Sequence, residues 1–166
     1  MKTNLHLLAI LYLLGTSSFA ASNPFDDASA AYERGDYVQG MKLFRQLAAQ
    51  GHQWAQRRLG SIYAEGNGVP QDYQEAVKWY RLAAAQGNES AQVNLGVMYT
   101  NGRGVRQDFV RAHMWFNLAA AASTGNSRDT ATENRDRIES KMTAEQIGTA
   151  QEMARRCQES KLKNCD

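Results

Sequence analysis

Residues 55–87 read AQRRLGSIYAEGNGVPQDYQEAVKWYRLAAAQG, and residues 91–120 repeat this pattern 36 positions later as AQVNLGVMYTNGRGVRQDFVRAHMWFNLAA. The two copies align without a gap and share alanine, glycine, tyrosine, aspartate and tryptophan at matching positions. A period of about 20 to 50 residues is typical of a solenoid, in which each repeat packs against its neighbours. The repeat therefore predicts the architecture of the chain, but it does not by itself indicate a function.

Each copy is expected to form two helices, which span about 53–65 and 72–86 in the first copy. Apolar side chains fall on one side of the first helix and form its predicted buried stripe: Ala55, Leu59, Ile62 and Tyr63. Glycine inside a helix costs about 1 kcal/mol relative to alanine. Because Gly60 nevertheless recurs as Gly96, we expect that only a hydrogen atom fits where the partner helix crosses.

The second helix of each copy opens on an aspartate, Asp72 or Asp108, whose side chain is expected to cap the helix. Aromatic pairs follow and are predicted to fill the core: Trp79-Tyr80 and Trp115-Phe116. The valine of each Gly-x-Gly-Val loop, Val69 or Val105, is expected to plug the gap between the helices. Every recurrent residue thus has a packing or turn role, so none of them indicates catalysis.

The repeat continues in weaker form on both sides, as expected for terminal repeats that lack one neighbour. Asp26 or Asp27 is predicted to cap a first short helix, and Asp36 to begin the second. Near the C-terminus, Thr143 and Gln146 have capping-box spacing. The prediction is eight helices in four antiparallel pairs. We divide the chain into a signal peptide, a leader, a degenerate repeat, two full repeats, a C-terminal capping helix pair and a tail: 1–20, 21–26, 27–52, 53–88, 89–124, 125–160 and 161–166.

The first 20 residues have the pattern of an export signal. Lys2 is followed by an apolar run from Leu5 to Gly15, and small residues at Ser18 and Ala20 favour cleavage after Ala20. The run is short for a bilayer span, which needs roughly 20 residues. We therefore expect an exported protein, periplasmic or secreted, with no stable membrane anchor after cleavage.

Charge and cysteine content limit the functional classes. The 19 Lys and Arg residues nearly balance the 17 Asp and Glu residues, so no electrostatic footprint for nucleic acid is expected. The two cysteines, Cys157 and Cys165, lie close together near the C-terminus. In an oxidising compartment such cysteines usually pair, and we predict a structural disulfide that pins the end of the last helix.

The pattern A-xxx-LG-xx-Y-xx-G-x-GV-xx-D-xxx-A-xx-W-xxx-AA-xx-G resembles the Sel-one-like repeat (SLR), a relative of the tetratricopeptide repeat. Residues 55–87 and 91–120 match it at nearly every signature position, whereas 27–52 match only its second half. The resemblance implies a right-handed α-solenoid with a concave groove that binds a partner protein or peptide. Exported bacterial members are similar to regulators of envelope signalling, assembly factors and host-interaction proteins. We expect a monomer, and an assembly part without a dedicated groove ligand is an alternative.

The same resemblance raises a catalytic alternative, because some cysteine-rich exported members have been described as penicillin-binding proteins or weak β-lactamases. Those members carry a cysteine pair in each repeat, whereas only Cys157 and Cys165 have that spacing here. Residues 160–163 match the Ser-x-x-Lys motif of serine acyl-enzymes but lack its companion motifs. His52 is expected in a turn and His113 on the outer surface of its helix, with no metal-binding spacing. We therefore expect no enzyme, no cofactor and no metal site.

A partner-binding groove is predicted from the positions opposite the buried stripe of the first helix in each repeat. These positions are Arg57, Ser61 and Ala64, and their copies are Val93, Val97 and Thr100. One repeat would present a cation and the other an apolar patch, which suits a peptide or helix with an acidic group beside an aliphatic anchor. The alternative is that Val93 and Val97 pack against the next helix, near residues 128–141.

Overall fold

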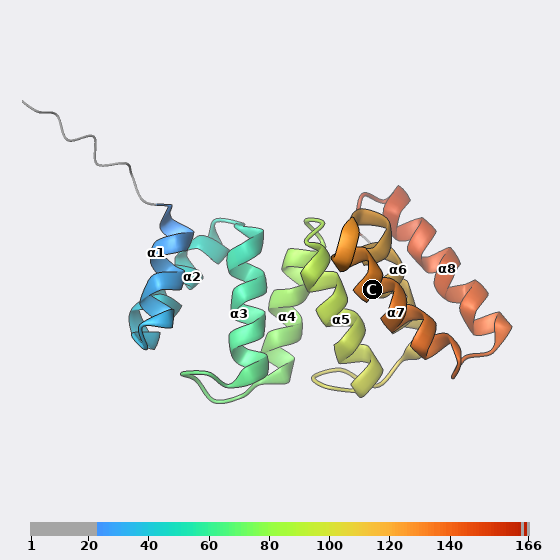
Figure 1. The fold of residues 1–166 in the computed structure, drawn as a ribbon, viewed down its shortest axis with the longest axis horizontal. Helices are drawn as coiled ribbons and strands as arrows, with labels where there is room; N and C mark the ends of the chain where they lie inside the picture. Colours follow the sequence, from blue (N-terminus) through green and yellow to red (C-terminus); the bar gives the residue numbers. More distant parts are fainter. Residues whose placement is uncertain (1–22, 164, 166) are drawn as a thin grey trace, which may run out of the picture.

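The computed structural model describes residues 23–163 and 165, and within them every regular element is an α-helix. The eight helices of this part are α1 (Pro24–Glu33), α2 (Tyr37–Ala49), α3 (Gln53–Glu65), α4 (Tyr73–Ala84), α5 (Glu89–Asn101), α6 (Phe109–Ala122), α7 (Gly125–Glu139) and α8 (Ala144–Glu159). They form a row that follows the chain (Figure 1). The predicted all-α solenoid of helix pairs is confirmed, while the expected signal peptide 1–20 lies outside the described residues.

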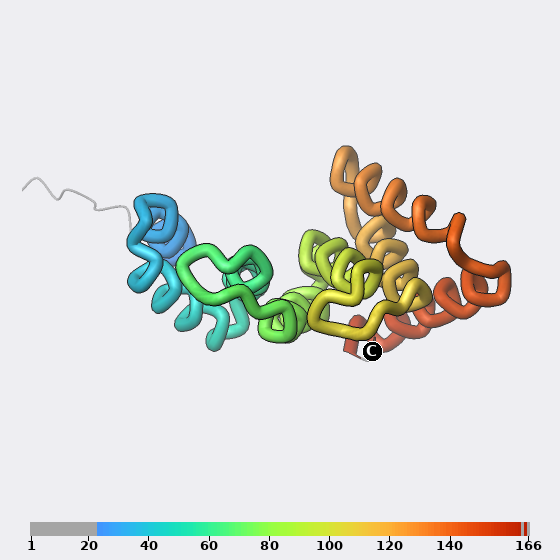
Figure 2. The backbone as a smooth tube through the Cα atoms, turned by 90° about the horizontal axis from the view of Figure 1, so that it is seen from below, coloured from blue at the N-terminus to red at the C-terminus, as the bar shows by residue number. Residues whose placement is uncertain are grey.

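Successive helices pack into pairs, α1 on α2, α3 on α4 and α5 on α6, and each pair joins the next through α2–α3 and α4–α5. The order changes after α6. Both α7 and α8 pack extensively against α6, whereas they contact each other little. Figure 2 shows the two helices diverging from the turn between them. The expected C-terminal helix pair is therefore present as two helices, but α6 rather than their mutual contact holds them.

Side-chain caps begin the helices where the sequence predicts them. The carboxylates of Asp36, Asp72 and Asp108 accept hydrogen bonds from backbone amides three residues later, at 3.1, 2.9 and 2.9 Å. Thr143 and Gln146 form the predicted capping box at the start of α8. The prediction for α1 was wrong: Asn23 caps this helix, because Pro24 occupies its first turn ahead of the two aspartates.

The glycines inside α3 and α5 allow the partner helices to approach closely. A Cβ atom at Gly60 would lie 2.5 Å from the ring of Tyr80, and one at Gly96 would lie 2.5 Å from the ring of Phe116. Real Cβ atoms do not come this close to another heavy atom. The prediction that only a hydrogen atom fits at these crossings is confirmed.

Buried apolar side chains form two main clusters along the row. The N-terminal cluster joins α1, α2 and α3 around Phe44 and Leu59, and Val69 packs against it. The larger C-terminal cluster joins α4 to α8 around Leu95 and Phe116. A disulfide between Cys157 and Cys165, with Cα atoms 4.8 Å apart, confirms the predicted bridge. Within the described residues no helix is both long and apolar enough to span a membrane.

Candidate functional site

Ser61 does not face a groove, which corrects the sequence prediction. Its side chain is buried, and the hydroxyl of Tyr80 lies 3.2 Å from the Ser61 hydroxyl oxygen. The reason is the missing side chain at Gly60, which lets the Tyr80 ring cross onto α3. The α3 face opposite the buried stripe is therefore partly covered by α4.

The copies of these positions in α5 are also partly buried. Val93 packs against a small cluster that includes Ala119 of α6 and Ala131 of α7, and Val97 packs against the C-terminal cluster. For Val93 this matches the alternative in which it packs against the next helix of the same kind. Thr100 donates a hydrogen bond to the Gly96 carbonyl at 2.8 Å. A partner-binding role for these residues stays a prediction.

Arg57 is half-buried on α3. Burial is the main cause that lowers its pKa, and the positive charge of neighbouring Arg58 adds to the effect. Its Nε atom is buried and makes no hydrogen bond with any described group. Ala64, about two turns further along the same face, packs against the C-terminal cluster. Arg57 thus presents a partly desolvated cation rather than a freely exposed one.

The residues that α3 exposes were missed by the sequence prediction. Trp54 is 46% exposed, which is unusual for so large an aromatic side chain, and the half-buried Arg58 lies one turn further along the helix. The guanidinium of Arg58 sits 5.2 Å from the centre of the Tyr32 ring. The 36-residue register aligns Trp54 with Ser90 and Arg58 with Asn94 of α5. Because the copies at these positions are polar, the register indicates a surface position for the large Trp54 side chain, and this signal in the sequence could have identified it.

The corresponding positions of α5 border a depression of about 240 Å³ between α5 and α7, which we name the α5–α7 depression. Polar residue types predominate among those that line it: Glu89, Ser90, Val93, Asn94, Ser123, Ser127 and Thr130. In Figure 1 the first turns of α5 and α7 lie near one another at the upper edge of the row. The exposed residues of α3 together with this depression form the candidate site, which we call the inner face.

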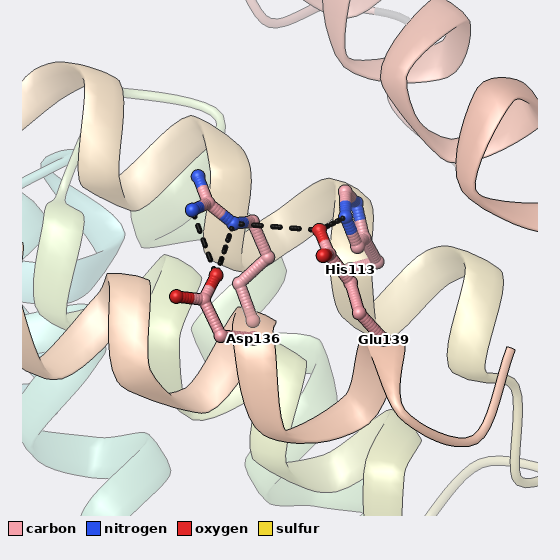
Figure 3. A network of polar contacts seen from close by, with 4 residues as sticks. His113, Asp136 and Glu139 are labelled. Atoms are coloured by element: carbon pink, nitrogen blue, oxygen red, sulfur yellow. Dashed lines mark hydrogen bonds and ion pairs between the residues drawn. The ribbon is translucent and has the colours of Figure 1, made fainter.

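His113 is the second correction, because it is buried rather than on the outer surface of α6. Its side chain is 1% exposed, and its Nε2 atom lies 2.7 Å from a carboxylate oxygen of Glu139 on α7. Figure 3 shows this contact beside the pair formed by Arg135 and Asp136. Among the described residues nothing bonds to the His113 Nδ1 atom. The pair joins α7 to α6. Because no described serine, threonine or cysteine side chain bonds to the His113 Nδ1 atom, His113 is not placed to activate a nucleophile.

The Ser-x-x-Lys match lies in the turn that ends α8. Ser160, which starts the Ser-x-x-Lys match, ends α8 and donates a hydrogen bond to the Cys157 carbonyl at 2.8 Å. Lys161 and Leu162 after it both have positive φ values, so the motif lies in a turn. The described part of the chain holds no group of three or more histidine, cysteine or carboxylate side chains arranged for a metal ion.

Three consecutive segments, residues 28–52, 55–88 and 89–123, match the Sel1 repeat model. The chain belongs to the Sel1 repeat family. The resemblance predicted from the sequence is confirmed, and the family matches also include the degenerate N-terminal repeat. Sel1 repeats form a protein–protein interaction fold and are typically non-catalytic scaffolds.

Two solved structures of Sel1 repeat proteins are similar to this chain. One is c5321, a protective antigen present in uropathogenic Escherichia coli strains that displays an SLR fold, with 34% identity over 86% of this chain and a TM-score of 0.75. The other is a Sel1 repeat protein from Oxalobacter formigenes, with 30% identity over 68% of this chain and a TM-score of 0.61. The matches cover 30% and 44% of those two chains. No curated protein matches this sequence.

Proposed function

We propose that this Sel1 repeat protein is exported and binds a partner protein or peptide in the cell envelope, through its inner face. The family supports a protein partner. The single observation that supports the inner face as the binding surface is Trp54, a large aromatic side chain that α3 leaves 46% exposed. Tryptophan and arginine dominate the binding energy of protein interfaces, and Trp54 lies one turn from Arg58.

Export is the second part of the proposal. The charged start, short apolar run and small residues of positions 1–20 support it, as does the disulfide, because disulfides persist in oxidising compartments. The test is N-terminal sequencing of the protein recovered from a periplasmic or secreted fraction of an expressing bacterium. A mature chain that begins at Ala21 supports export. Recovery only from the cytoplasm, with residues 1–20 still attached, contradicts it.

The partner-binding part is tested by comparing two exposed hydrophobic residues on different helices. Trp54 on α3 and Leu82 on α4 are 46% and 50% exposed, so truncating either leaves the core intact. Truncation of an interface hot spot costs about 2 kcal/mol or more, which corresponds to roughly a 30-fold loss of affinity. We expect Trp54→Ala to weaken binding by at least this factor and Leu82→Ala to leave it within about two-fold.

The measurement is photo-crosslinking in envelope extract from a probe at Gln53, beside Trp54, followed by titration of the captured protein against both variants. Melting temperatures of the variants serve as the folding control. Equal affinity of Trp54→Ala and the unaltered protein contradicts binding through the inner face. That result favours the alternative, an envelope assembly part without a dedicated groove ligand.

A further inference from the structure

The N-terminus of α7 lacks the side-chain cap that the other described helices have. Thr124 precedes α7 but accepts no hydrogen bond from its first turn, whereas α1 to α6 and α8 each have a side-chain acceptor at this position. First-turn amides have no intrahelical partner and together carry about half a positive charge. Helix α7 therefore presents backbone donors for which its own N-cap residue supplies no acceptor.

A second, independent observation lies next to this helix end. Ser123 borders the α5–α7 depression, is only 6% exposed, and its hydroxyl oxygen makes no hydrogen bond with any described group. A buried hydroxyl without a partner destabilises the protein, because it has lost its hydrogen bonds to water without replacing them. A ligand oxygen that reaches Ser123 would remove this cost and meet the first-turn amides of α7 at the same place.

The other walls of the depression supply hydroxyl and amide groups, which can donate hydrogen bonds as well as accept them. The Thr130 hydroxyl already donates to the Asn126 carbonyl at 2.9 Å. Ser90 and Asn94 come from α5, and Ser127 and Thr130 come from α7. Glu89 is the one charged residue of the lining. It belongs to the first turn of α5, where the positive end of that helix offsets its charge.

The charged side chains nearest on α7 belong to a different surface. Arg128, Asp129 and Arg135 line a separate depression against α6, together with Asn117. Their charges therefore do not line the α5–α7 depression, where a ligand would bind. At about 240 Å³, the space is below the range of roughly 300–1,000 Å³ typical of small-molecule pockets, and it suits a single side chain better than a whole cofactor.

We infer that the α5–α7 depression binds the carboxylate of an aspartate or glutamate side chain from a partner peptide. The carboxylate accepts hydrogen bonds from the first-turn amides of α7 and from the hydroxyl of Ser123, and so acts as an N-cap supplied by another molecule. Val93 lines the depression beside it and can contact the aliphatic part of the same side chain. The site differs from the predicted one, in which Arg57 would meet the acidic group.

This inference deepens the proposed partner binding and rests on it for its biological role, but its test does not need the partner. The probe is acetyl-aspartate N-methylamide, and acetyl-asparagine N-methylamide is its uncharged isostere. Each is titrated into the ¹⁵N-labelled protein while the amide resonances of residues 123–128 are followed. The amides that begin α8, which Thr143 already caps, are the internal control.

We expect saturable shifts at residues 126–128 with a dissociation constant in the millimolar range, and at least ten-fold weaker binding of the asparagine probe. Ser123→Ala should weaken binding at least three-fold. Thr124→Asp should abolish it, because its own carboxylate caps the helix. Glu89→Gln should strengthen it, because a like charge is removed.

The inference is overturned if both probes bind equally, if no saturable shift is seen, or if binding survives Thr124→Asp. It is also overturned if Glu89→Gln binds the aspartate probe more weakly, which would indicate a cationic ligand. If the aspartate probe fails while Trp54→Ala still weakens partner binding, the carboxylate site is wrong and the proposed function stands. If the aspartate probe binds while Trp54→Ala has no effect on partner affinity, the carboxylate site stands and partner binding through the inner face is wrong.

Discussion

At the scale of single residues, the closeness of paired helices depends on glycines that have no room for a methyl group. Replacing a helical glycine by alanine normally stabilises a protein by about 1 kcal/mol through helix propensity. At Gly96 the new Cβ atom would lie 2.5 Å from the ring of Phe116, which is 1% exposed and packed in the C-terminal cluster. Overpacking of this kind costs about 1–3 kcal/mol. We therefore expect Gly96→Ala to lower the melting temperature.

The control is Gly148, which lies inside α8 and has no atom within 4 Å of its hypothetical Cβ. Gly148→Ala should raise the melting temperature, because propensity acts there without a clash. Thermal unfolding followed by circular dichroism compares the two variants. A Gly96→Ala protein as stable as the Gly148→Ala protein would show that the helices can separate at little cost.

The two residues whose environment was wrongly predicted show what a single helix pattern leaves open. The 36-residue register places His113 on the positions of Val77 and Met41, which are 2% and 4% exposed, so the repeat itself predicts a buried site. The sequence prediction nevertheless placed it on the outer surface of its helix, beside Ala112. Ser61 was misplaced for another reason: a helical wheel identifies the most apolar face, but it does not show that α4 covers the adjacent one.

At the scale of helices, local signals determined the elements well. The bounds of α3 and the caps of α2, α4, α6 and α8 follow from short patterns of glycine, aspartate and threonine. The start of α7 at Gly125 and its missing side-chain cap were not predicted, because the repeat weakens there. Helix α6 packs against both helices that follow it, whereas α2 and α4 each pack extensively against only one. The depression beside α7 was unpredictable for the same reason.

The disulfide is expected to stabilise the end of α8 by restricting the unfolded chain. Cys157 and Cys165 are eight residues apart, and closing a loop of this size contributes roughly 2–3 kcal/mol in the chain-entropy model. Both residues belong to the C-terminal cluster, where Leu162 also packs. We expect Cys157→Ser with Cys165→Ser to lower the free energy of unfolding by about this amount in denaturant titrations.

Reduction of the unaltered protein with dithiothreitol should lower the free energy of unfolding by a similar amount, and it should leave the double variant unchanged. This comparison separates the covalent link from the loss of two buried sulfur atoms. Equal stability of the oxidised and reduced proteins would contradict a structural role for the bridge.

At the scale of the whole molecule, the row of helices has two cores that contact each other mainly where α3 meets α4. Stability in such arrays is roughly a sum of repeat and nearest-neighbour terms, so damage stays local. Phe44 is fully buried in the N-terminal cluster, and Phe44→Ala should cost about 3–5 kcal/mol. Hydrogen exchange should then accelerate across α1 to α3 while α5 and α6 stay protected. Leu95→Ala in the other cluster should give the opposite pattern. Uniform acceleration by both variants would instead mean that the two cores unfold as one cooperative unit. Neither core would then hold its part of the inner face folded after the other had unfolded.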